Sequence, residues 1–312
     1  MNPTDASSII LTLITLFAAT VNGALGYGFS SITVPVALIF YTNRVLNPAL
    51  VLIEVVINIY VLIINRESIP TIWKRACPIL IGLIPGVVVG SYLLSSIHPG
   101  WIKFFTYLFL LPLIFVQAAG IRRPIRLEKT VGLPFGAGIG FLYSVTTISG
   151  PPLAVFFNNQ GLVKREFRAA LGLIRLTGSS LTAISYYSLG LYSVESRATL
   201  SGIIPSVVIG IPVGAFLIRR IDPETFRRIC MSFDVWVVSF GLSRVLIDLK
   251  WIANPFAYGV MVAALIFDGY LLRDYFTKRR AVLSQPFSPE RVPVLPSVRP
   301  MPPAETQWNR KE

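Results

Sequence analysis

The stretch of sequence that decides the fold of this chain reads Gly136-Ala137-Gly138-Ile139-Gly140-Phe141-Leu142-Tyr143-Ser144-Val145-Thr146-Thr147-Ile148-Ser149-Gly150-Pro151-Pro152-Leu153-Ala154-Val155-Phe156-Phe157. The apolar segment 131–157 is too long for one membrane crossing and too short for two, because a helical crossing takes about 20 residues. Two consecutive prolines interrupt it, and proline removes a backbone donor and clashes with the preceding helical turn. Broken backbone at membrane depth is tolerated only where it is buried in protein or lines a cavity. The stretch therefore predicts a transport site.

The composition predicts an all-α polytopic membrane protein. Of the 312 residues, 54% are hydrophobic and only 14% are charged, and several runs are long enough to cross a bilayer. The net charge of +13 would suggest nucleic acid in a soluble chain. Here the basic residues cluster in loops and in the tail, so membrane topology explains them and we expect no nucleic-acid partner. Cys77 and Cys230 have no paired spacing, so we expect no disulfide framework, no metal site and no cofactor.

The chain divides into two halves, a last helix and a tail. We expect a first transmembrane repeat at 1–125, a second at 126–250, a final transmembrane helix at 251–275 and a tail at 276–312. Asp5 and the lack of an early basic cluster argue against a cleaved signal peptide. The tail is basic, and residues 277–312 contain seven prolines without apolar periodicity, so we expect disorder there. The expected full spans lie at about 45–65, 76–96, 101–120, 167–189, 199–218, 229–247 and 252–272.

Lysine and arginine counts distinguish two ways in which the broken segments could cross. If both are re-entrant hairpins, one side of the membrane receives 14 basic residues and the other receives 4. If both simply cross, the same loops divide 9 to 9. Because basic loops lie on the cytoplasmic side, the counts favour a hairpin at 131–158 and a cytoplasmic tail. They do not decide the first broken segment, around 22–31, because a hairpin in the second segment alone also gives 14 to 4.

An internal repeat favours a hairpin in each half. The matched positions are Gly86, Gly90 and Pro99 with Gly210, Gly214 and Pro223 at an offset of 124, Ala49-Leu50 with Ala170-Leu171 at 121, and the breaks near Gly28 and Gly150. Two halves that each comprise a hairpin and three spans have opposite orientations. Inverted repeats with broken helices at corresponding positions indicate the site of a secondary transporter. Chance matches of glycine and proline are the alternative explanation.

The repeated motifs resemble those of the TauE/SafE (sulfite exporter) family of bacterial permeases. The residues that resemble the family are Gly23-Ala24-Leu25-Gly26-Tyr27-Gly28-Phe29 with Pro35, Thr147-Ile148-Ser149-Gly150-Pro151-Pro152, and Phe167-Arg168. The resemblance covers about residues 8–270 and implies a secondary carrier of small anions, often sulfur-containing ones such as sulfite or sulfonates. Phe29-Ser30-Ser31 departs from the pattern, because many relatives carry further small or glycine residues there.

The two breaks supply the first candidate site residues. A half-helix that begins near Pro151 would direct free amides, such as those of Leu153 and Ala154, toward the membrane midplane, where helix N-termini attract anions. Gly28 and Ser30 could open the equivalent half-helix in the first repeat. The candidate substrate-binding residues at the breaks are Thr146, Thr147, Ser149, Gly150, Asn22, Gly28 and Ser30. Close helix packing is the alternative role of the glycines.

A charged residue near the middle of a span supplies the next candidate. Arg175 lies about nine residues inside its span, and Glu54 occupies the corresponding position at an offset of 121. Charges at that depth usually face a cavity or a partner. We expect Arg175 to bind the substrate anion and Glu54 to carry a coupling proton, or the two residues to form a buried ion pair. Asp234 lies about five residues from the expected cytoplasmic end of its span, where we expect water to reach it.

These features predict a secondary transporter of small anions that works by alternating access around the two broken helices, in the bacterial inner membrane. An intramembrane enzyme acting on a lipid or phosphate substrate is a competing class, but the spans contain no histidine, paired carboxylates or nucleophile–base pair. A passive anion channel is another. The identity of the anion, the direction of transport, the coupling ion (proton or sodium) and the oligomeric state stay open.

Overall fold

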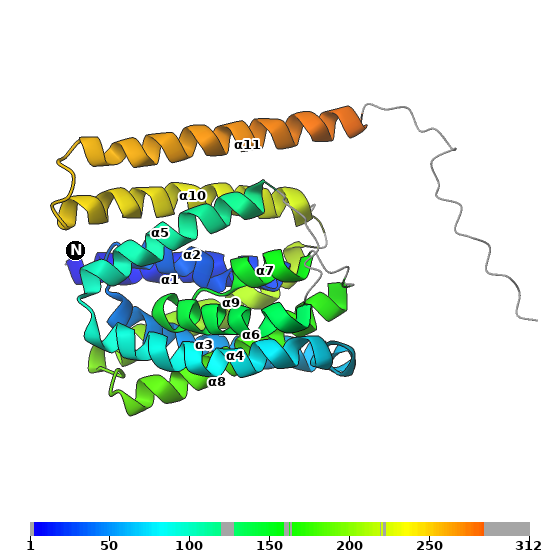
Figure 1. The fold of residues 1–312 in the computed structure, drawn as a ribbon. Coiled ribbons are helices and arrows are strands. Elements are labelled where there is room, and N and C mark those ends of the chain that lie inside the picture. The colour runs from blue at the N-terminus through cyan, green and yellow to red at the C-terminus, as the bar shows by residue number, and fades with distance from the viewer. Residues whose placement is uncertain are drawn as a thin grey trace, which may run out of the picture. The chain divides into compact units, whose positions relative to one another are not determined.

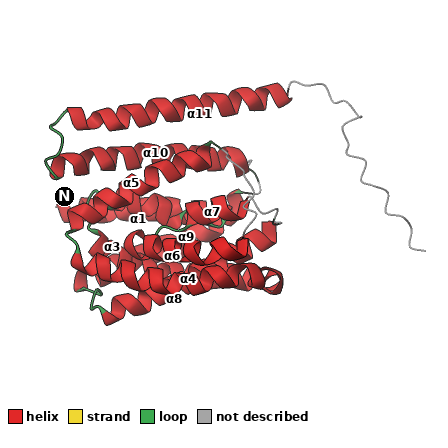
Figure 2. Ribbon diagram, viewed as in Figure 1, coloured by secondary structure: helices red, strands yellow, loops and turns green. Residues whose placement is uncertain are grey.

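The structure, a computed structural model, describes residues 3–119, 128–158, 162, 164–218, 220 and 223–283. Within these ranges every regular element is a helix (Figure 2). The α-helices are α1 Pro3–Leu25, α2 Phe29–Ala37, α3 Asn43–Ile64, α4 Ile69–Ser96, α5 Pro99–Ala118, α6 Glu128–Thr146, α7 Gly150–Asn158, α8 Lys164–Ser188, α9 Val194–Leu217, α10 Pro223–Asp248 and α11 Gly259–Leu283. Two 3₁₀ turns, η1 Arg66–Ser68 and η2 Phe256–Tyr258, precede α4 and α11.

Seven of the described helices are long and apolar enough to cross a membrane: α1, α3, α4, α5, α9, α10 and α11. The all-α membrane fold predicted from composition is therefore confirmed. Helix α8, expected as a full span at 167–189, is present but is not among the seven. Its sequence includes Arg175 and a run of hydroxyl side chains, and the helix packs against α3 and α4.

Two helix boundaries differ from expectation because of where the prolines lie. Helix α10 begins at Pro223 rather than near 229, so Arg227 and Arg228 belong to the helix. Helix α11 begins at Gly259, after Pro255, rather than at 252, and continues to Leu283 because no proline occurs before Pro286. Residues 1–272 form one compact unit, and residues from 273 belong to a second one. The rest of the predicted tail, 284–312, lies outside the described residues.

The two halves present the same order of elements: a broken pair, α1–α2 or α6–α7, is followed by three long helices (Figure 1). They also pack in matching pairs, since α4 lies against α6 as α9 lies against α1. A Cβ atom on Gly86 would lie 2.1 Å from the Ala137 carbonyl oxygen, and one on Gly210 would lie 2.8 Å from that of Leu16. Glycine thus permits backbone contact at both places. The inverted orientation of the halves stays a prediction that this pairing supports.

Each break has a residue with positive φ at the same repeat position, and the first break has a second one at Gly28. Gly26 has φ +85° and Thr147 has φ +58°, and they are 121 residues apart. The short helices that follow, α2 and α7, have nine residues each. The chain reverses after each break. Phe156 of α7 stacks on Phe135 of α6 with ring centroids 4.3 Å apart, and Lys103 near the start of α5 donates to the Leu38 carbonyl just after α2 (2.6 Å).

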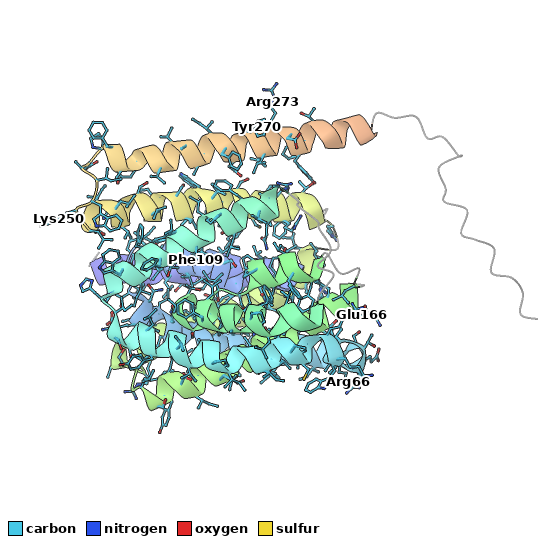
Figure 3. The ribbon with its side chains drawn as sticks, viewed as in Figure 1. Arg66, Phe109, Glu166, Lys250, Tyr270 and Arg273 are labelled. Atoms are coloured by element: carbon cyan, nitrogen blue, oxygen red, sulfur yellow. The ribbon has the colours of Figure 1, made fainter. Side chains whose placement is uncertain are left out.

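Charged residues mark the two ends of the helical unit. Figure 3 shows Arg66 and Glu166 at one end and Lys250 at the opposite end. At the first end, Arg165 and Glu67 form an exposed ion pair with a nitrogen–oxygen distance of 3.8 Å. The links α3–α4 and α7–α8 therefore meet at the same end, as the distribution of basic residues predicts.

Candidate functional site

A buried ion pair joins α3 and α8 at the positions that the repeat relates. Arg175 Nη2 lies 2.9 Å from Glu54 Oε1. Glu54 is 0% exposed and Arg175 is 4% exposed, so water contributes little to the solvation of either charge. Of the two roles predicted for these residues, the ion pair is present in this conformation. The Arg175 Nε atom is buried without a hydrogen-bond partner among the described residues.

The Glu54 carboxylate also connects the two helix breaks. Ser30, the second residue of α2, donates its hydroxyl to Oε1, and Tyr143, in the last turn of α6, donates its hydroxyl to Oε2 at 2.8 Å. Glu54 therefore accepts hydrogen bonds from three side chains that come from α2, α6 and α8. Charge-assisted hydrogen bonds to a buried carboxylate are stronger than neutral ones, so this cluster holds both breaks together around one negative charge.

The two breaks face each other in the protein interior. A Cβ atom on Gly150 would lie 3.6 Å from the Tyr27 side chain and 3.9 Å from the backbone nitrogen of Gly28. Gly28 has φ 108° and precedes α2, whose first helical bond runs from the Ile32 N–H to the Gly28 carbonyl (3.2 Å). The amides of residues 29–31 come before this bond, and such first-turn N–H groups have no partner within the helix.

The N-terminus of α7 differs from the prediction. The Leu153 N–H donates to the Ser149 carbonyl at 3.2 Å, so the expectation that this amide is free is wrong. Pro151 and Pro152 have no N–H. Helix α7 begins at Gly150. Its first turn therefore has few free backbone N–H groups, although several were expected there. The N-terminus of α2 is the richer in backbone donors.

A second pair of contacts, which sequence reasoning missed, also obeys the 121-residue offset. Asn47 Nδ2 of α3 donates to the Val145 carbonyl at 2.6 Å, and Arg168 Nη2 of α8 donates to the Ala24 carbonyl at 3.2 Å. Asn47 lies seven residues before Glu54 on α3, and Arg168 lies seven residues before Arg175 on α8. The sequence signal was the 121-residue offset between Ala49-Leu50 and Ala170-Leu171. Extended two residues toward the N-terminus, the same offset relates Asn47 to Arg168.

The remaining predicted site residues are buried but do not share one cavity. Thr146 accepts from the Ile148 amide (3.1 Å), and the Thr147 hydroxyl donates to the Thr146 carbonyl (2.6 Å). The Ser149 hydroxyl and the Asn22 Oδ1 atom are buried without a partner among the described residues. The Oδ1 and Nδ2 atoms of Asn58, one turn beyond Glu54 on α3, are also buried without a hydrogen-bond partner among the described residues.

Two cavities approach the breaks from opposite ends of the helices. A cavity of about 100 Å³ reaches Asn22 and Gly26, and Asn65 and Arg168 line it at the end of the unit that bears Arg66. A cavity of about 240 Å³ reaches Thr146 from the α4–α5 end, but its lining is apolar apart from Thr106 and Thr146. Only the first of these two offers an anion a cationic group. Among the described residues, no three His, Cys, Asp or Glu side chains group so as to hold a metal ion.

Comparison with known proteins gives the family. A family model described as "Sulfite exporter TauE/SafE" matches residues 11–240. The chain belongs to the TauE/SafE family. A relative from Cupriavidus necator (strain H16), described as "Probable sulfite/organosulfonate exporter TauE", is 26% identical over 178 residues, which are 56% of this chain and 68% of the relative. No solved structure matches the chain. The matched region includes both breaks and every predicted site residue, and it ends within α10. The resemblance predicted from the motifs is confirmed, and membership supports a membrane transporter of anions.

Proposed function

We propose that this protein is a secondary transporter of small sulfur-containing anions, such as sulfite or an organosulfonate, and that Arg175 binds the anion. The observation that carries the proposal is the buried Arg175–Glu54 pair, whose carboxylate is bonded to both helix breaks. Buried charges and broken helices mark the substrate sites of transporters. At such a site a substrate anion can bind Arg175 only if the Glu54 carboxylate moves away from it. The printed description of the relative names the same class of anion.

In this mechanism the substrate anion replaces the Glu54 carboxylate as the partner of Arg175. The Arg175 Nε, which is buried without a hydrogen-bond partner among the described residues, and the nearby Nη2 offer two parallel donors, a geometry that suits the oxygens of a sulfite or sulfonate group. The first-turn amides of α2 lie beside the Ser30 hydroxyl and add donors with the favourable end of the helix dipole. Ser149, Thr146, Thr147 and Gly150 from the second break, with Asn22 and Gly28 from the first, complete the proposed site.

Alternating access would follow from rearrangement of the two breaks about this pair. Of the two cavities that approach the breaks from the helix ends, the one at Arg168 has the cationic lining, on the end that bears the basic links. By the positive-inside rule that end faces the cytoplasm, so the proposed state opens inward and the chain lies in the bacterial inner membrane with its C-terminal tail in the cytoplasm. Opening the other side requires loosening of the Asn47–Val145 contact.

Counterflow in proteoliposomes tests the function. We expect saturable, exchangeable flux of radiolabelled sulfite or of a small sulfonate by the wild type, and loss of at least about tenfold in Arg175→Lys, since an ammonium lacks the forked donor geometry. Arg44→Gln is the matched control, because the Arg44 guanidinium donates to the carbonyls of Leu94, Ser95 and Ile97 and not to the pair. Flux that does not saturate or exchange would identify a channel, and no flux from folded protein would reject the transporter.

A further inference from the structure

Asp234 of α10 is a buried carboxylate that the ion pair does not use. Helix α10 begins at Pro223, so Asp234 lies eleven residues inside it, about 16 Å along the axis at 1.5 Å per residue. The side chain is buried, with the residue 7% exposed, and Oδ1 has no hydrogen-bond partner among the described residues. The expectation that water reaches Asp234 because of its short distance from the helix end is therefore wrong, since that end lies six residues earlier than expected.

The cavity beside Asp234 touches both helix breaks. Its lining includes Gly28 and Ser31 from the first break, Pro151 from the second, and Gln117 of α5. Gln117 donates its amide to the Pro151 carbonyl at 2.7 Å. The cavity has a volume of about 20 Å³, which is enough for about one water molecule. A proton and a water can occupy this space, whereas a sulfonate cannot.

The surroundings of Asp234 contain few groups that could stabilise its charge. The other ionisable residues that line the cavity are Tyr27, Arg227 and Cys230, with Arg227 two turns away along the same face of α10. The residues that α2, α5 and α7 contribute to it are uncharged. On α11, Asp268 accepts from Ser232 at 3.3 Å and interacts with Arg228. Asp234 thus differs from Glu54, whose carboxylate has an arginine and two hydroxyls.

We propose that Asp234 is the proton-carrying group of the transport cycle. The inference rests on the proposed function and assigns its coupling ion. An ionised carboxylate is expensive to bury without hydrogen-bond partners, and Oδ1 of Asp234 has none among the described residues, so Asp234 holds its proton in this conformation. When either break moves, the cavity that touches both opens to water and the proton leaves. Glu54, which the sequence suggested for this role, serves instead as the counter-charge that the substrate displaces. One proton and one monovalent anion then cross together and move no net charge.

Proteoliposomes that contain the full chain and trapped pyranine provide the test. With one-to-one coupling, a pH gradient of one unit sustains about a tenfold accumulation of a monovalent sulfonate. We expect the wild type to show this accumulation and anion-dependent proton movement. Asp234→Asn should retain counterflow, which needs no net proton transfer, and should lose both the accumulation and the proton signal. Asp268→Asn is the matched control and should retain all three, because that carboxylate does not line the cavity.

The other outcomes distinguish a failure of the role of Asp234 from a failure of the proposed transporter function. Proton movement that persists in Asp234→Asn, or accumulation driven by sodium and not by pH, overturns the role of Asp234 and leaves the transporter intact. Absence of counterflow in the wild type rejects the proposed function itself. Asparagine imitates a protonated aspartate in shape, so failure of Asp234→Asn to fold would contradict a protonated side chain. Asp234→Glu is the second variant. It keeps a carboxyl group at this position, so it should retain proton movement with a shifted pH dependence.

Discussion

Replacing Glu54 by glutamine should destabilise the protein because it leaves the Arg175 charge buried without a counter-charge. Glutamine has nearly the same shape, so its carbonyl oxygen can still accept from Ser30 and Arg175, and the Tyr143 hydroxyl can accept from its amide. What changes is the charge. The two side chains are 3% and 1% exposed at Arg175 and Glu54, so solvent cannot compensate for its loss.

The structure allows the size of the effect to be worked out. Removing one partner of a buried ion pair costs about 3–5 kcal/mol. For a chain of this size that loss lowers the midpoint of thermal unfolding by on the order of 10 °C. Glu67→Gln is the matched control, since Glu67 pairs with Arg165 on the surface, where both side chains are at least 80% exposed. Exposed pairs contribute less than about 1 kcal/mol.

Thermal unfolding in detergent, with and without a small sulfonate, is the assay. We expect Glu54→Gln to unfold well below the wild type, and Glu54→Gln/Arg175→Gln to recover much of the loss because no unpaired charge remains. If Arg175 is the anion site, the sulfonate should stabilise Glu54→Gln more than the wild type, since it supplies the missing negative charge. A single variant as stable as the wild type, or a double variant no better than the single one, would refute the reasoning from charge burial.

Three further predictions concern the breaks, the packing of the halves and the topology. Thr147→Gly should raise the free energy of unfolding by about 1 kcal/mol, because threonine is strained at φ +58°, whereas Thr177→Gly within α8 should lower it by a similar amount; a loss at Thr147 would exclude strain there. Gly86→Ala should cost about 3 kcal/mol, because its Cβ would lie 2.1 Å from the Ala137 oxygen, and Gly138→Ala, where no atom lies within 4 Å, should be nearly neutral in the same unfolding measurement. In a Cys77→Ser background, a membrane-impermeant maleimide should label Lys250→Cys in intact cells and Arg66→Cys only in opened ones, and the reverse pattern would invert the topology.

Much of the fold followed from local chemistry that a sequence displays directly. Apolar runs predicted the long helices, and the double proline at Pro151-Pro152 predicted the second break. The 121-residue offset related Glu54 to Arg175, and these two residues meet. Helix ends were less accurate, because the start of α10 was placed after Arg227 and Arg228 although both belong to the helix. A charged pair signals the edge of an apolar run, not the end of hydrogen bonding along the backbone.

The predictions that went wrong depended on contacts between distant segments. The free amide expected at Leu153 was wrong because α7 begins at Gly150, and the exposure expected at Asp234 was wrong because α10 begins earlier and packs against α2 and α5. The partners of Glu54 at Ser30 and Tyr143 had no signal in spacing alone, since they lie on α2 and α6, whose faces meet α3 only after folding.

The sequence by itself determined the membrane class, the two breaks, the family and the corresponding positions of an acid and a base in the two halves. Composition, proline chemistry and repeat spacing involve neighbouring residues or one fixed separation in the chain. They can therefore be recognised without coordinates. Only the tertiary structure decided which carboxylate accepts from three side chains and which one has an oxygen without a hydrogen-bond partner among the described residues. Glu54 and Asp234 are both acids within apolar helices, and their difference arises from the hydroxyl and guanidinium groups that neighbouring helices bring to one and not to the other.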